Sequence, residues 1–187
     1  MIIGIVGRRH VGKDLVSNYI ETTYGYENRK FAGPMKQALI ALFDFTSTQV
    51  SGDLKEVVDE RWKVSPRQVM QFFGTDMMQM TLQKLIPDIG RNFAVKRLFI
   101  NSDSNKPFCI SDVRFQHEVL AIHERGGITI HIHRATNEKE KIDEIDSHES
   151  EAGIDQLQST YTIFNNGTKE ELFAQVDLIL KNIKHKT

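Results

Sequence analysis

The first fourteen residues constrain the fold more than any other part of the chain. Residues 2–6 read IIGIV, a short apolar and mostly β-branched run that predicts a buried strand. Residues 7–14 follow at once as GRRHVGKD, and residues 13–23 have the apolar spacing of a helix. A glycine-rich turn between a strand and a helix directs successive backbone N–H groups toward one point. The sequence therefore predicts an anion-binding loop.

The loop has nearly the pattern G-x-x-x-x-G-K-[ST] of phosphate-binding loops, with Asp14 in place of the serine or threonine. Gly7 would turn the chain out of the strand, and Gly12 would let the backbone approach the phosphates. Lys13 would reach the terminal phosphate oxygens. Asp14 could replace the usual hydroxyl as an oxygen ligand of Mg²⁺, directly or through water. A charged turn that caps a helix, with Asp14 favourable near the helix dipole, explains the same residues without a ligand.

Strands and helices alternate along the rest of the chain. Further strands are expected at residues 25–32, 107–111, 128–133 and 161–164, and helices at 33–43, 65–73, about 91–99, 115–125 and 169–184. Residues 46–64 and 143–151 are polar and show no periodicity that assigns them. The alternation predicts an α/β fold, a mostly parallel sheet of about five strands with helices on both faces. In such sheets ligands bind at the carboxyl ends of the strands.

Size and composition limit the classes of protein that the chain can belong to. A length of 187 residues suits one domain, and a formal net charge of −1 gives no long-range attraction for a nucleic-acid polymer or an acidic membrane. Cys109 is the single cysteine, so an intrachain disulfide is excluded and a reducing cytoplasm fits best. The N-terminal apolar run is too short for a signal peptide or a membrane span. We expect a soluble cytoplasmic protein with neither nucleic acid nor membrane as partner.

Six segments, in this order, carry a resemblance to a known family. They are GKD at 12–14, FAGPMKQAL at 31–39, SPRQVMQFFGTD at 65–76, ISDVRFQHE at 110–118, HESEAG at 148–153 and FNNGT at 164–168. Together they closely resemble the phage-type deoxynucleoside monophosphate kinases, a family of phosphate-loop (P-loop) kinases with a three-layer α/β fold. The resemblance runs from residue 1 to about residue 180.

The resemblance implies an enzyme that moves the γ-phosphate of ATP to a deoxynucleoside monophosphate (dNMP), with Mg²⁺ as cofactor. It implies a single kinase domain over 1–187, with an acceptor-binding region at about 33–98 and a lid at about 135–151. The compartment would be the host cytoplasm if the source is a phage or another virus, and a homodimer is left open.

Other readings of the same residues remain open. The animal-type phosphomevalonate kinases share GKD, a G-P-x-K segment and S-D-x-R, and they are the alternative enzyme. Residues 67–76, RQVMQFFGTD, favour the nucleotide acceptor. Leu15 departs from the family, which often has threonine there. A nucleotide switch or motor and a silent ATP-binding module are the alternatives outside enzymes.

The resemblance places four residues in catalysis and a larger set around ATP. Asp112, expected just after the strand at 107–111, would hold Mg²⁺ or its water or orient the acceptor. Arg114 would pair with phosphate, unless the two form a salt bridge with each other. Arg134, at the start of the lid, would stabilise the transition state together with Lys13. The expected ATP-binding residues are Gly7, Arg8, Val11, Gly12, Lys13, Asp14, Leu15, Asn165 and Asn166.

The acceptor site is expected to use a second group of residues. Lys36 lies one turn into a predicted helix, and its amine together with the helix N-terminus could hold the acceptor phosphate. Arg67 lies in the first turn of another predicted helix, where the helix dipole disfavours a cation unless an anion binds nearby. Gly74, Thr75 and Asp76 could contact a base or sugar, or they could form a helix C-cap followed by a new N-cap. Arg114 completes this expected acceptor group. Solvated surface roles remain the alternative for Lys36.

Two histidines alternate at the end of the strand at 128–133. His131 and His133 would lie on the same face of the sheet because side chains alternate along a strand. The sequence shows no cysteine near them and no H-E-x-x-H spacing. A packing role is therefore expected for both.

Overall fold

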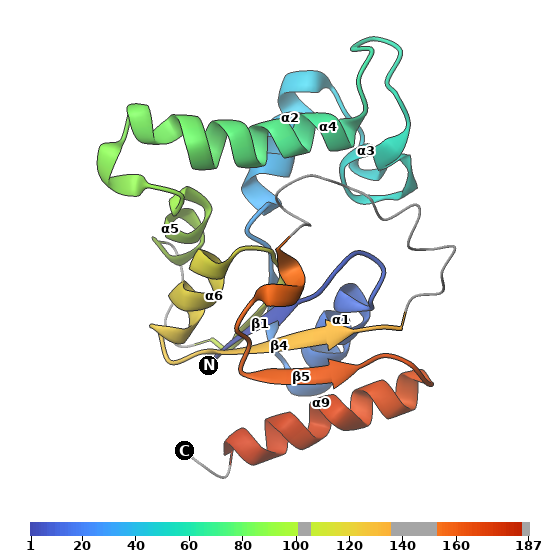
Figure 1. Cartoon of the computed structure of the whole chain (residues 1–187). Helices are drawn as coiled ribbons and strands as arrows, with labels where there is room; N and C mark the ends of the chain where they lie inside the picture. Colours follow the sequence, from blue (N-terminus) through green and yellow to red (C-terminus); the bar gives the residue numbers. More distant parts are fainter. Residues whose placement is uncertain (101–105, 136–152, 185–187) are drawn as a thin grey trace. The chain divides into compact units, whose positions relative to one another are not determined.

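The computed structural model describes residues 1–100, 106–135 and 153–184, and it contains one parallel sheet (Figure 1). The five strands are β1 (Ile2–Val6), β2 (Glu27–Arg29), β3 (Phe108–Val113), β4 (Ile128–His133) and β5 (Tyr161–Phe164). They are ordered β2-β3-β1-β4-β5, and every neighbouring pair is parallel. The predicted α/β fold and parallel sheet are confirmed, although β2 is shorter than the run at 25–32 suggested.

Helices occupy most of the remaining described chain. The α-helices are α1 (Lys13–Tyr24), α2 (Gly33–Phe43), α3 (Ser47–Ser51), α4 (Pro66–Gln71), α5 (Phe93–Ile100), α6 (Gln116–His123) and α9 (Lys169–Lys184). Short 3₁₀ turns are η1 (Asp53–Glu56), η3 (Leu82–Lys84), η4 (Pro87–Ile89) and η5 (Ile154–Gln156), and η2 (Phe72–Thr81) is a π-helix. Each helix expected from the sequence is present, with bounds that differ by a few residues.

The chain forms two compact units. One consists of Met1–Lys30 and Asp103–Thr187 and contains the sheet, and the other, Phe31–Ser102, is helical. In the second unit, apolar side chains from α2, α3 and α4 make a separate core; its buried members are Met35, Leu39, Phe45, Val50 and Val69. Part of the region that periodicity left unassigned is also ordered there. Thr46 and Gln49 form a reciprocal capping box that starts α3.

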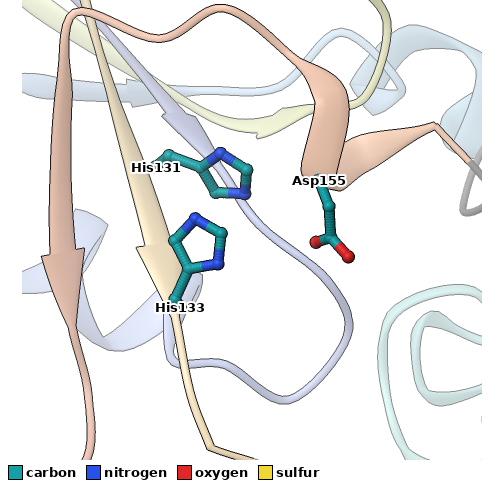
Figure 2. A group of neighbouring side chains, drawn as sticks. All are labelled: His131, His133 and Asp155. Atoms are coloured by element: carbon teal, nitrogen blue, oxygen red, sulfur yellow. The ribbon is translucent and has the colours of Figure 1, made fainter.

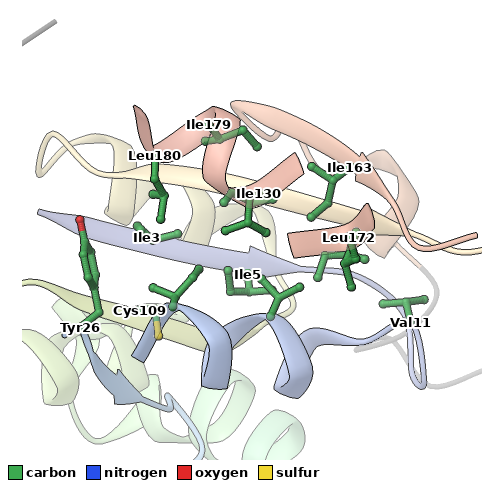
Figure 3. Packing of buried hydrophobic residues seen from close by; sticks show 14 residues of the cluster. Ile3, Ile5, Val11, Tyr26, Cys109, Ile130, Ile163, Leu172, Ile179 and Leu180 are labelled. Atoms are coloured by element: carbon green, nitrogen blue, oxygen red, sulfur yellow. The ribbon is translucent and has the colours of Figure 1, made fainter. Parts of the chain in front are cut away.

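Successive residues of β1 face opposite sides of the sheet, and helices pack on both sides. Ile3 and Ile5 point into a core shared with α1 and α9, which pack on the same face (Figure 3). Gly4 lies between them and faces the opposite side. A Cβ atom added at Gly4 would lie 2.6 Å from the side chain of Ile122 on α6, so only glycine lets this helix pack so closely.

The face covered by α1 and α9 is further fixed by a polar link between these helices. The hydroxyls of Tyr19 and Tyr24 on α1 both donate to Oδ1 of Asp177 on α9, at 2.8 and 2.7 Å. The Tyr19 ring also stacks on Phe173, with the ring centroids 3.9 Å apart. These contacts hold α1, and therefore the loop that precedes it, against the sheet. Within the described part of the chain, no helix is long and apolar enough to cross a membrane.

Candidate functional site

The loop between β1 and α1 lies at the carboxyl end of the central strand and is closely packed. Gly7 and Gly12 have φ values of 152° and 104°. A Cβ added at Gly7 would lie 2.8 Å from the carbonyl oxygen of Ile132 on β4, and one added at Gly12 would lie 2.7 Å from Nδ2 of Asn165. Glycine is therefore required at Gly7 by close approach to backbone and by conformation, and at Gly12 chiefly by its positive φ value.

Lys13, the first residue of α1, folds its side chain back over this loop. Its ammonium donates to the carbonyl oxygen of Gly7 at 2.8 Å and to that of Arg8. The ammonium is thus held at the loop where α1 begins, next to the positive end of the helix dipole. This arrangement concentrates positive charge where the sequence predicted an anion site.

Segments that follow two other strands also contact the loop. Asn165, after β5, donates through Nδ2 to the carbonyl oxygen of Val11 at 2.9 Å. Arg134, after β4, donates through Nη1 to the carbonyl oxygen of His10 at 3.4 Å. Asn166 accepts through Oδ1 from the backbone N–H of Ala135 at 2.8 Å, which joins the two segments. The fold therefore brings residues that are more than a hundred positions apart to one loop.

Arg8 has a partner that the sequence analysis did not identify. Its Nε and Nη2 donate to Oδ2 of Asp155 in η5, at 2.9 and 2.6 Å. The Arg8 guanidinium holds the pKa of the Asp155 carboxyl below its usual range, and burial opposes this shift. Asp155 lies outside every motif quoted above, and no pattern in the sequence indicates its contact with Arg8.

Asp14 and Leu15 follow Lys13 on α1 and face different surroundings. The carboxylate of Asp14 is 78% exposed and forms an ion pair with Lys30 at 3.0 Å. Leu15 packs against the core beneath α1, so this position makes an apolar contact. An exposed carboxylate on the first turn beside the loop suits Mg²⁺, which is usually bound by one or two carboxylates together with substrate phosphates.

Asp112 and Arg114 lie at the end of β3, next to the central strand. The strand runs to Val113, so the expectation that Asp112 follows the strand is wrong by two residues. Between Gly4 and Val6 of β1 the register with β3 shifts, from Gly4 opposite Ile110 to Val6 opposite Val113. The extra residue on β3 is a bulge, which changes the direction of the side chains around Asp112.

Arg114 begins the turn between β3 and α6, and Glu118 fixes that turn. The Glu118 carboxylate accepts from the backbone N–H of Arg114 at 2.7 Å and from that of Phe115 at 3.1 Å. Glu118 is therefore a helix-capping side chain. Arg114 also borders an open groove of about 690 Å³. Its other lining residues are Phe115, Gln116, Leu120, Gly153, Gln156, Leu157 and Gln158.

The expected acceptor residues all lie in the second unit, apart from Arg114. Lys36, on the first turn of α2, donates to Oγ of Ser51 at 3.2 Å. Arg67, on the first turn of α4, forms an ion pair with Glu56, whose side chain is 60% exposed. Glu56 offsets the unfavourable position of Arg67 near the helix N-terminus without any ligand.

Gly74, Thr75 and Asp76 lie inside the π-helix η2, so a helix does not end and restart here, and the C-cap alternative is wrong. Thr75 is buried and Asp76 is exposed. A Cβ at Gly74 would approach the sulfur of Met35 to 3.2 Å, which accounts for a small residue at this position. π-helices often occur at functional sites because they shift side chains out of the α-helical register.

Comparison with known proteins now identifies the family. The model of the family described as "Deoxynucleotide monophosphate kinase" matches residues 41–176. A protein of Acanthamoeba polyphaga mimivirus that carries the same kinase name is 31% identical over 186 residues, which cover 94% of each chain. This chain belongs to the deoxynucleotide monophosphate kinase family.

Two further similarities agree with that membership. The deoxynucleotide monophosphate kinase of Enterobacteria phage T4 is 27% identical over 129 residues, which are 69% of this chain and 50% of the phage protein. The structure of dephospho-CoA kinase from Campylobacter jejuni matches with a TM-score of 0.50 at 14% identity, over 97% of this chain and 96% of that one. The second match shows a shared fold. These findings give the phosphomevalonate kinase alternative no support.

Some expected parts of the kinase lie outside the described residues. The lid expected at about 135–151 is covered by the structure only at Ala135, and the HESEAG segment only at Gly153. What the structure does show is the start of the expected lid, where Arg134 reaches the loop and Ala135 contacts Asn166.

The buried cap Glu118 generates a prediction about stability and pH. Burial raises the pKa of Glu118 to about 8, and its backbone donors oppose that shift. A raised pKa means that the folded protein keeps a proton that the unfolded chain loses above pH ~4.5. The resulting stabilisation is complete below that pH and is lost as the pH rises through 8. Glu118→Gln should therefore flatten the fall in unfolding free energy between pH 5 and 8.5, by on the order of a few kcal/mol.

Urea denaturation at a series of pH values measures this difference. Glu124→Gln is the matched control, because Glu124 is exposed at the other end of the same helix. It should keep the wild-type slope. An identical slope in Glu118→Gln and wild type would contradict the role given to burial.

Proposed function

We propose that this kinase transfers the γ-phosphate of ATP to a deoxynucleoside monophosphate and releases ADP and a deoxynucleoside diphosphate. Family membership supports the class of substrates. The observation that carries the proposal is the convergence on one loop of Lys13, Arg134 and Asn165, which come from three different strand ends. These are the carboxyl ends of adjacent parallel strands, where such folds bind nucleotides.

ATP would bind through its phosphates to the loop. The backbone N–H groups of the turn and the N-terminus of α1 provide donors, and Lys13 adds a positive charge. Gly7, Arg8, Val11, Gly12 and Leu15 shape or border this loop, and Asn165 and Asn166 would lie beside the adenine. Replacing the carbonyl partners of Lys13 with phosphate oxygens requires only rotation of the lysine side chain, because its ammonium already lies at the loop.

Phosphoryl transfer needs two polyanions brought into line and their charge neutralised. Arg134 would stabilise the charge that develops on the transferred phosphoryl group, since it is already hydrogen-bonded to the loop. The segment that follows it would close as a lid and exclude water, which would limit hydrolysis of ATP. Arg114 would hold a phosphate on the opposite side of the transfer, in a turn kept rigid by Glu118.

Two carboxylates fit a role in holding Mg²⁺. Asp14 is exposed beside Lys13, and Asp112 lies at the bulge near the end of β3. When bound, Mg²⁺ would supply neutralising charge to the phosphate oxygens of ATP. Asp14 would exchange its contact with Lys30 for this ligand role.

In the second unit, Lys36 and Arg67 would bind the acceptor nucleotide through its phosphate, and the Gly74–Asp76 segment would bind its base or sugar. The second unit, Phe31–Ser102, corresponds closely to the acceptor-binding region expected at about 33–98. A phosphate dianion would compete with the exposed Glu56 for Arg67, and the doubly charged ligand has the stronger Coulomb attraction.

The partners in this proposal are small nucleotides. A net charge of −1 favours neither a nucleic-acid polymer nor an acidic membrane, and the single cysteine suits a reducing cytoplasm. We propose that the whole of 1–187 acts as one kinase domain. Whether a homodimer forms is answered by light scattering of the purified chain.

The proposed reaction predicts that ADP appears from ATP and Mg²⁺ only when a deoxynucleoside monophosphate is present. The four common deoxynucleoside monophosphates and phosphomevalonate should be compared in a coupled assay of ADP release. At least one deoxynucleotide should be phosphorylated, and phosphomevalonate should not. Equal ATP hydrolysis with and without every acceptor would instead indicate a nucleotide switch or motor.

Lys13→Ala should lower kcat by about 10²–10³-fold, the range for removing one donor to charge that develops in a transition state. The fold should persist, because the Lys13 ammonium contacts loop carbonyls and the substitution leaves the core cluster beneath α1 unchanged. Steady-state kinetics and circular dichroism measure the two effects. Lys181→Ala, an exposed lysine of α9, is the control and should match wild type. A Lys13→Ala enzyme with normal kcat would remove this lysine from the mechanism.

Arg67→Ala should chiefly raise the KM for the deoxynucleotide, because the lost interaction is with the acceptor phosphate. An increase of about tenfold or more is expected, which corresponds to roughly 1.4 kcal/mol of binding free energy. Arg97→Ala, an exposed arginine of α5 in the same unit, should leave the KM unchanged. An effect confined to the KM for ATP would take Arg67 out of the acceptor site.

A further inference from the structure

Three side chains that the proposed kinase mechanism does not use form a cluster beside the loop. Among the described residues, His131, His133 and Asp155 are the group in which three potential metal ligands lie close together. One ligand atom from each lies within 4.8 Å of the others. Figure 2 shows both imidazole rings of β4 and the carboxylate of η5 turned toward the same space. His131 and His133 stack with their ring centroids 4.0 Å apart.

His131 supplies the observation that points to a ligand. The residue is only 4% exposed, and in the part of the chain that the structure describes its Nε2 atom is buried without a hydrogen-bond partner. Buried polar atoms almost always have a partner, so such an atom needs an explanation. Packing alone, the role expected from the sequence, would not explain why an unsatisfied nitrogen is retained beside a second imidazole and a carboxylate.

We propose that His131, His133 and Asp155 bind a divalent first-row transition-metal ion of the Zn²⁺ class, at a site separate from the Mg²⁺ site of the proposed reaction. Two imidazoles and one carboxylate suit Zn²⁺, Co²⁺ or Ni²⁺, whereas Mg²⁺ prefers oxygen ligands. The set leaves a fourth position open, as in zinc sites with three protein ligands.

The geometry requires only small movements of the side chains. Ligands about 2.0–2.2 Å from a tetrahedral Zn²⁺ are about 3.4 Å apart, closer than the 4.8 Å limit of the cluster. His131 is fixed by burial, so His133 and Asp155 must approach it. His133 is half-buried, and the side chain of Asp155 is 46% exposed on a short 3₁₀ turn. Both can move without opening the core.

Asp155 connects this site to the phosphate loop. Its Oδ2 accepts both hydrogen bonds from Arg8, which lies in the loop. A metal ion bound to this carboxylate would oppose the Arg8 guanidinium, because two cations would then share one anion. The ion and Arg8 should therefore compete for Asp155, and the metal would alter the loop through that competition.

Direct metal binding tests the site without nucleotide and without activity, so its outcome is independent of the proposed kinase reaction. Isothermal titration of the full chain with ZnCl₂ should show one site. Co²⁺ should give the visible absorption of a four-coordinate ion with nitrogen and oxygen ligands. His133→Ala and Asp155→Asn should each raise the Kd by at least about tenfold, since even an outer-shell partner is worth 10–100-fold. His131→Asn should also raise the Kd by at least about tenfold. Because His131 is buried, this variant can lose Zn²⁺ binding through a folding defect, and the less buried His133→Ala tests the site without that ambiguity.

Two further variants sharpen the result. His117→Asn removes a half-buried histidine that stacks on Phe115 outside the cluster, and it should bind Zn²⁺ as wild type does. Arg8→Ala should lower the Kd for Zn²⁺ several-fold, because it removes the competing cation. Unchanged Zn²⁺ affinity in the three cluster variants would overturn the site. So would the absence of any binding at about 100 µM Zn²⁺, a concentration at which only weak sites remain empty. An unchanged Kd in Arg8→Ala would overturn the competition for Asp155.

Discussion

The close approach between the phosphate loop and the neighbouring strands is the constraint on which the rest of the structure depends. Gly7 lies against the backbone of β4, and Gly12 lies against Asn165 after β5. A side chain at Gly7 would push the loop away from β4, and one at Gly12 would displace the Asn165 side chain from the loop. The contact of Asn165 with Val11 would then be lost, and the carbonyls that hold Lys13 would move. The absence of a side chain at Gly7 and at Gly12 thus lets the loop after β1 stay in contact with the ends of β4 and β5.

Much of this arrangement could be read from the sequence because it rests on local rules. The run IIGIV and the apolar spacing after Lys13 define a strand, a loop and a helix without help from distant residues. Parallel pairing then follows from the alternation of strands and helices, and it puts Arg134 and Asn165 at the same edge as Lys13. The order of elements predicts their place at the strand ends, whereas the roles expected of them come from the family resemblance.

Other features could not be predicted because they depend on contacts distant in sequence or on small changes of register. The bulge that includes Asp112 within β3 arises from its pairing with β1, and nothing in residues 107–113 signals it. The π-helix over Gly74 reads locally as the end of a helix, since glycine there fits a C-cap equally well. Asp155 pairs with an arginine 147 residues earlier, a contact that periodicity cannot show. By contrast, the capping box of Thr46 and Gln49 was visible in the sequence and was missed.

Three charged side chains of the expected site, Arg8, Asp14 and Arg67, each form an ion pair in this structure. Asp14 is paired with Lys30, Arg8 with Asp155 and Arg67 with Glu56, and each pair includes a partner that is substantially exposed. Exposed ion pairs contribute only about 0–1 kcal/mol, so a phosphate or a metal ion can replace one partner at little cost. These pairs keep the cations near the positions where ligands would need them.

His131 differs from these ion pairs because its imidazole is buried away from water. A buried imidazole with an unsatisfied nitrogen cannot turn to water as an exposed side chain can, so its cost persists until a ligand arrives. Its nearest anionic partner is the same Asp155 that Arg8 contacts from the loop. The Asp155 carboxylate therefore lies between the exposed guanidinium of Arg8, which gains little from the ion pair, and the His131 Nε2 atom, which is buried without a hydrogen-bond partner among the described residues. A metal ion that binds both Asp155 and the Nε2 atom of His131 would gain a contact that the hydrogen bonds from Arg8 to Asp155 do not supply.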